Sequence, residues 1–127
     1  MNNEPQIIML ATDLMFSSNV SGFSADRKVK FRRLENVEDF ATELKTCANA
    51  DTLVMIDLGI DQLNLDAVFQ AIPESLKATA IAFAPHVHVQ KLDAAQQAGI
   101  GRVMSRGQFS AQIGRIVHGF KDQFEAK

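Results

Sequence analysis

Two aspartates stand where buried strands are expected to end. Asp13 closely follows the apolar run 7–11, and Asp57 directly follows the run 52–56. Short runs of this kind are typical of strands buried on both faces of a parallel sheet. Open parallel sheets bind ligands beyond the carboxyl ends of their strands, where the strand order reverses. Two carboxylates at that edge could hold Mg²⁺, which prefers oxygen ligands, and a metal-screened aspartate could accept a phosphoryl group.

Each aspartate also has a purely structural explanation. An aspartate after a strand commonly shapes a turn or caps the next helix. Taken alone, Asp13 or Asp57 is more often a residue of that kind. The pair at the ends of two central strands favours a site, and both interpretations stay open at this stage.

Five strand-like segments alternate with five helix-like segments along the chain. The strand-like segments are 7–11, 29–34, 52–56, 80–83 and 102–104. The helix-like segments are 16–27, 37–48, 63–72, 89–98 and 109–124. Asn36 is a plausible cap of the second helix, and Ser110 lies near the expected start of the last. This alternation predicts βαβ units in an α/β flavodoxin-like three-layer sandwich, with a five-stranded parallel sheet of order 2-1-3-4-5 and helices on both faces. The charged segment 29–34 suits an edge strand.

Composition limits the classes of function. The 127 residues suit a single domain, 1–127, with 46% apolar and 22% charged residues and a net charge of -2. The chain has no excess of basic residues that would indicate nucleic-acid binding. No apolar run is long enough to span a membrane. We therefore expect a cytoplasmic protein. The one cysteine, Cys47, lies beside apolar neighbours, so we expect it in the core. Phosphate-loop, dinucleotide and nucleophile-elbow motifs are absent, and we do not expect an enzyme.

Three local motifs carry a resemblance to a known family. They are LVMIDL at 53–58, AAQQAGI at 94–100 and RVMSRGQF at 102–109. Together with the order and lengths of the elements, they resemble the receiver domains of bacterial response regulators, including the single-domain chemotaxis type. The resemblance covers about residues 6–118.

The resemblance assigns candidate roles at the acidic edge. It implies that Asp57 is the phosphoacceptor and that Asp13 and the backbone carbonyl of Gly59 complete a metal site with it. Mg²⁺ is therefore a possible cofactor. Thr12 stands where the family usually has a further acidic residue, and Arg106 stands in place of its lysine.

Other positions depart from the family pattern. Ala84 falls where a threonine or serine would hydrogen-bond the phosphoryl group, and alanine has no hydroxyl. Val103 falls at the aromatic switch position. The arginine at 106 keeps the positive charge but is not equivalent to a lysine ammonium. These departures favour a divergent receiver or pseudo-receiver over one that switches in the usual way.

The resemblance also suggests how such a protein would act. It implies signal transduction by protein–protein interaction, with a sensor kinase or a downstream effector as partner. A homodimer could form through the face made by 89–98, 102–104 and 109–124. The alternative is a flavodoxin-like small-ligand binder or enzyme that uses the same crevice, with Asp13, Asp57, His86 and Arg106.

Two further clusters have ordinary explanations and one alternative each. His86 and His88, with Asp93 nearby, could form a metal site, but loop histidines are usually solvated. The basic residues between 27 and 33 are expected to protect a sheet edge, and an acidic partner surface is the alternative.

Overall fold

The computed structural model describes residues 4–126 and contains one sheet of five parallel strands. The strand order is β2–β1–β3–β4–β5, as the sequence predicts. The strands are β1 (Gln6–Leu10), β2 (Lys30–Leu34), β3 (Thr52–Asp57), β4 (Ile81–Ala84) and β5 (Arg102–Ser105). The charged strand β2 lies at one edge, and the order reverses between β1 and β3, as in flavodoxin-like folds.

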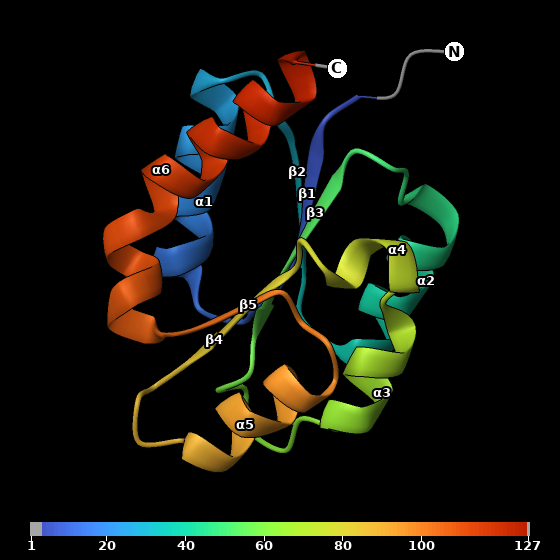
Figure 1. Cartoon of the computed structure of the whole chain (residues 1–127), viewed down its shortest axis with the longest axis vertical. Coiled ribbons are helices and arrows are strands. Elements are labelled where there is room, and N and C mark those ends of the chain that lie inside the picture. Colours follow the sequence, from blue (N-terminus) through green and yellow to red (C-terminus); the bar gives the residue numbers. More distant parts are fainter. Residues whose placement is uncertain (1–3, 127) are drawn as a thin grey trace.

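Helices cover both faces of the sheet (Figure 1). On one face lie α1 (Leu14–Asp26) and α6 (Arg106–Glu125), side by side. The other face carries α2 (Val37–Cys47), α3 (Leu65–Ala71), α4 (Glu74–Lys77) and α5 (Val89–Gln97). The predicted three-layer arrangement is therefore confirmed.

The central strands have apolar side chains on both faces, which explains their unbroken apolar runs. Ile7 and Met9 of β1 pack beneath α1 and α6, whereas Ile8 and Leu10 pack beneath the other helices. All four are fully buried. A strand that alternated polar and apolar residues could not fill both layers.

The start of the last helix differs from the prediction. The helix begins at Arg106, not near Ser110, because Ser105 caps it. The Ser105 hydroxyl accepts from the backbone N–H of Gln108, and the Gln108 side chain accepts from the backbone N–H of Ser105. This reciprocal capping box leaves no loop between β5 and α6. The sequence S-x-x-Q carried the signal, but the apolar periodicity begins only at Phe109.

Some of the smaller predictions are confirmed, and others are wrong. Asn36 caps α2 through the backbone N–H of Asp39, as predicted, and Gly99, at φ +91°, follows α5. The short helix α4 was not predicted. Cys47 is exposed at the last residue of α2, whose buried residues are Phe40 and Leu44, so the prediction of a core position is wrong.

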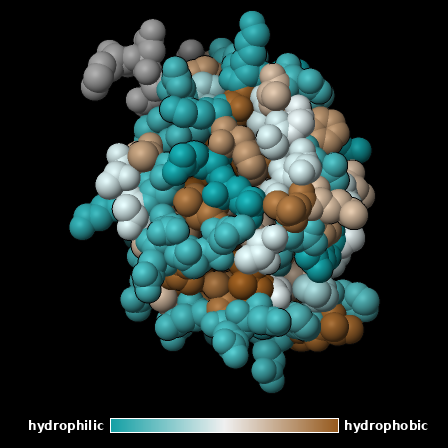
Figure 2. All heavy atoms as spheres, turned by 180° about the vertical axis from the view of Figure 1, so that it is seen from behind, coloured by the Kyte–Doolittle hydropathy of each residue, from teal (hydrophilic) through white to brown (hydrophobic). Residues whose placement is uncertain are grey.

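The face of the molecule that Figure 2 shows is largely hydrophilic. Arg27, Arg32 and Arg33 form ion pairs with Asp122, Glu43 and Glu35, respectively, which supports the prediction of a protected edge. On the face turned away from Figure 1, hydrophobic atoms gather in small separate patches (Figure 2). Among residues 4–126, no helix is both long and apolar enough to cross a membrane.

Candidate functional site

Asp13 and Asp57 come together at the carboxyl edge, and each also has the structural role that the sequence left open. Asp13 caps α1: its Oδ1 accepts from the backbone N–H groups of Met15 at 2.8 Å and Phe16 at 3.2 Å. Asp57 shapes the turn after β3, where its Oδ1 accepts from the backbone N–H of Gly59 at 2.8 Å. Each carboxylate therefore has one oxygen held by the backbone.

Arg106 lies between the two carboxylates. Its Nη2 is 3.0 Å from Asp13 Oδ2, with which it forms a hydrogen bond, and 3.6 Å from Asp57 Oδ2. The Asp57 side chain is only 4% exposed, whereas those of Asp13 and Arg106 are about one-third exposed. One guanidinium thus offsets one of the two negative charges and is shared between the acids.

Aromatic rings hold Arg106 in this position. Its guanidinium carbon lies 4.7 Å from the centre of the Phe16 ring, a cation–π contact. Phe16 in turn contacts Phe83 and Phe109, which stack with ring centres 4.0 Å apart. Because Phe83 and Phe109 are fully buried, this support is part of the core. The Nε of Arg106 is buried and has no hydrogen-bond partner among the described residues, so the side chain is anchored by Nη2 and by its face.

The support that Phe16 gives to Arg106 could not be predicted from the sequence. Phe16 lies in the predicted helix 16–27, but its contact with Arg106 joins residues ninety positions apart in sequence. Helical spacing alone could not reveal that contact. The only available signal was that Phe16 lies three residues after a capping aspartate, on the first turn of a helix that starts at the site.

Burial has the largest effect on the pKa of Asp57. Removal from water raises the pKa of this carboxyl above its ordinary value of 3.8. The backbone hydrogen bond from Gly59 and the charge of Arg106 act in the opposite direction, and the charge of Asp13 adds to the rise. The acid is therefore harder to ionise than a free one, despite the adjacent arginine.

A divalent cation fits this arrangement poorly. Three of the four carboxylate oxygens accept hydrogen bonds, and the fourth, Asp57 Oδ2, faces Arg106. The positive charge already occupies the space between the acids. Within residues 4–126, no group of three or more His, Cys, Asp or Glu side chains could hold a metal ion, and this includes the His86, His88 and Asp93 alternative.

Three further positions singled out by the resemblance are Thr12, Ala84 and Val103. Thr12 is exposed beside Asp13, and Ala84 is fully buried at the end of β4. Val103 packs, partly buried, against the apolar layer beneath α5. No hydroxyl stands at position 84 to contact a group bound to Asp57.

Compared by sequence, the chain matches no protein-family model and no curated protein. Compared by structure, it is similar to a response regulator receiver domain from Rhodospirillum rubrum, at 11% identity over 91% of this chain and 92% of that one, with a TM-score of 0.67. It is also similar to a receiver domain of a Francisella response regulator, at 7% identity over 94% and 98% of the two chains, with a TM-score of 0.71. The chain has the fold of a response regulator receiver domain.

One further neighbour with this fold carries a different description. It is a pilus assembly protein, CpaE, from Caulobacter crescentus, at 13% identity over 90% of this chain and 91% of that one, with a TM-score of 0.62. At such low identities the likeness shows the receiver fold alone, and function has to be argued from the site.

Proposed function

We propose that this receiver-fold chain is a signalling protein that acts by binding another protein, and that Arg106 takes the place of a metal ion in its acidic site. The observation that carries the proposal is the position of Arg106 Nη2 between Asp13 and Asp57. A permanent cation there offsets one of the two negative charges in every state of the protein. The protein would then present one fixed surface to its partner without a phosphorylation cycle.

Two further observations support a fixed state. The Asp57 side chain is only 4% exposed, and Arg106 lies beside its outer oxygen. A phosphoryl donor would therefore have to displace Arg106 to reach Asp57. A phosphoryl group on Asp57 would then find alanine at position 84 instead of a hydroxyl donor. The loss of a hydrogen bond to a charged group costs about 1.5–3 kcal/mol, which is as large as the coupling energies of many switches, about 1–3 kcal/mol.

The partner surface belongs to the same proposal. We place it on the face formed by α5, β5 and α6, where β5 is a short edge strand. A kinase, an effector or a second copy of the chain could bind there. The alternative, a small-ligand site at the carboxyl edge, has no comparable observation in its favour, since Arg106 fills the space between the acids.

A phosphodonor assay tests the fixed state. The wild-type protein is incubated with Mg²⁺ and acetyl phosphate, and its intact mass is measured. We expect no gain of a phosphoryl group, whereas a variant with Arg106→Lys and Ala84→Thr should gain one that is lost on adding Asp57→Ala. A base-labile adduct on the wild-type protein that requires Asp57 would overturn the proposal and establish a working phosphoacceptor.

A further inference from the structure

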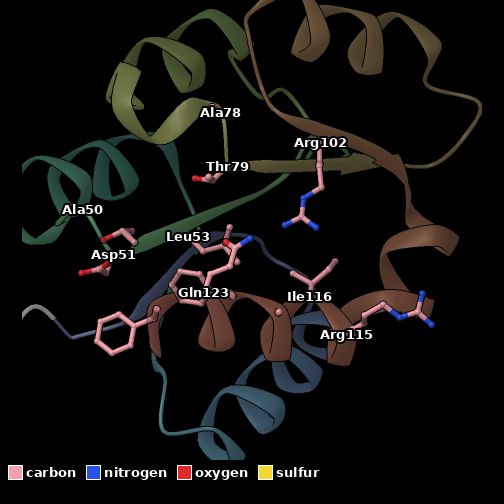
Figure 3. Close-up of a pocket in the computed structure, with 13 residues that line it drawn as sticks. Ala50, Asp51, Leu53, Ala78, Thr79, Arg102, Arg115, Ile116 and Gln123 are labelled. Atoms are coloured by element: carbon pink, nitrogen blue, oxygen red, sulfur yellow. The ribbon is translucent and has the colours of Figure 1, made fainter. Parts of the chain in front are cut away.

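A pocket lies at the amino edge of the sheet, at the end of the strands opposite the acidic site (Figure 3). It occupies about 380 Å³ between the second half of α6 and the starts of β3 and β5. Ligand pockets in proteins usually measure about 300–1,000 Å³, so this one suits a small molecule. The labelled residues Leu53, Thr79, Arg102 and Gln123 come from four separate parts of the chain and surround one space.

Small residues leave this space open. Gly119 lines the pocket from α6, and a Cβ atom built on it would meet nothing within 4 Å. The hollow therefore reaches the backbone of the helix. Ala50 and Ala78 line other parts of the wall with a single methyl group each.

The wall beside β5 is held rigidly. The backbone N–H of Gly101 donates to the carbonyl of Lys77 at 2.9 Å. A Cβ atom at Gly101 would lie 1.8 Å from the carbonyl oxygen of Ala78, so only glycine permits this approach. The loop 78–79 is thereby fixed against the start of β5, and the pocket exists without any rearrangement of that loop.

Arg102 gives the pocket a positive end. Because side chains alternate along a strand, Arg102 shares the α6 side of β5 with Met104, which packs into the core there. Its guanidinium points into the pocket (Figure 3). Within residues 4–126, this guanidinium takes part in no ion pair and no side-chain hydrogen bond. The five donors of this guanidinium thus face the cavity and are not bonded to any of its side chains.

The rest of the lining is mixed: apolar residues form one side, Thr52, Thr79 and Gln123 are neutral and polar, and the other charges lie apart from Arg102. Ile116 and Leu53 are buried in the lining, and Phe120 and Phe124 are partly buried there. The carboxylate of Asp51 lies at the end away from Arg102, and the guanidinium of Arg115 points outward (Figure 3). An anionic group is therefore favoured only at the Arg102 end.

We propose that this pocket binds a small amphipathic organic anion. Its aromatic or aliphatic body would lie against Ile116, Phe120 and Phe124, and its carboxylate, sulfonate or phosphate group would pair with Arg102. The proposal goes beyond the signalling function at the carboxyl edge and does not depend on it, since the two sites share no residue.

Fluorescence titration with anilinonaphthalene sulfonate, an aromatic anion, tests this proposal. We expect the folded wild-type protein to bind one molecule and to enhance its emission. Gly119→Leu places a side chain in the open space without a backbone clash and should abolish binding. Gly22→Leu is the matched control, because a Cβ atom at the helical Gly22 also meets nothing within 4 Å but lies outside the pocket, and it should bind like the wild type.

A charge test completes the design. Arg102→Gln should weaken binding of the sulfonate about tenfold, as expected for the loss of one charge-assisted hydrogen bond that is partly open to water. It should leave binding of the neutral analogue phenylnaphthylamine unchanged. Amide shifts of wild-type Leu53, Thr79 and Gly119 on adding the sulfonate provide a readout that needs no variant. Binding that survives Gly119→Leu, or amide shifts confined to other residues, would refute the pocket, and equal loss of both probes in Arg102→Gln would refute the role of the charge.

Discussion

The coupling energy between the charges of Arg106 and Asp57 should be larger than that of a shorter ion pair on the surface. The perturbation is a double-mutant cycle of Arg106→Met and Asp57→Asn. Methionine keeps an unbranched apolar side chain over Phe16, and asparagine keeps an oxygen for the N–H of Gly59. The cycle therefore removes the charges and keeps most of the packing.

The expected magnitude follows from distance and exposure. At 3.6 Å, two unit charges attract by about 4.6 kcal/mol at an effective dielectric constant of about 20. Water around Arg106, whose side chain is 36% exposed, reduces this value. We expect a coupling energy of about 1–2 kcal/mol, above the usual range for exposed pairs.

The matched control is the pair of Arg27 and Asp122. Its atoms are closer, at 2.8 Å, but its side chains are 30% and 69% exposed. For the cycle Arg27→Met with Asp122→Asn, we expect about 0.2–0.5 kcal/mol. Both cycles are measured by urea unfolding at neutral pH and low salt. The reasoning fails if the Arg106–Asp57 coupling is no larger than that of the control, because burial would then not decide the strength of these pairs.

Two further predictions concern Asp57 and Gly101. Since the pKa of Asp57 is raised in the folded protein, the folded state binds this proton more tightly than the unfolded chain, and stability is lost as the pH rises from 3.8 through the raised pKa. Asp57→Asn should therefore raise the thermal midpoint of unfolding at pH 7. This gain should vanish below pH 3.8, the ordinary pKa of the carboxyl, because Asp57 is then protonated in both states. An equal gain at pH 7 and below pH 3.8 would argue against titration as the cause. Gly101→Ala should cost about 1–3 kcal/mol or more in chemical unfolding, because its Cβ atom would overlap the carbonyl oxygen of Ala78. Gly107→Ala, at a helix position with open space, should be close to neutral, and a similar loss in both variants would contradict this account.

The fold could be predicted from the sequence because two independent patterns agree. Apolar runs such as 7–11 and 52–56 require burial on both faces, and the amphipathic segments between them supply the covering helices. Predictions failed where a local cap or end effect overrode periodicity, as at Ser105 and Cys47.

The pairing of Asp13 with Asp57 was also predictable, but the position of Arg106 between them was not. Strand ends placed Asp13 and Asp57 together, whereas the orientation of Arg106 depends on the ring of Phe16 from another helix. The amino-edge pocket had no signal in the sequence. A cavity arises from what small residues such as Gly119 fail to fill, and that is a property of packing between distant segments.

The capping box at Ser105 has a mechanical consequence. It joins β5 directly to α6, whose twenty residues form a rod of about 30 Å at 1.5 Å per residue. The first residue of that rod is Arg106, and its far turns carry Phe120 and Phe124. The acidic site and the amino-edge pocket therefore lie at the two ends of one helix, so a shift of its axis at one end would reach the other. If a ligand at one end does shift the helix, thermodynamic reciprocity requires an equal free-energy effect of the other end on that ligand.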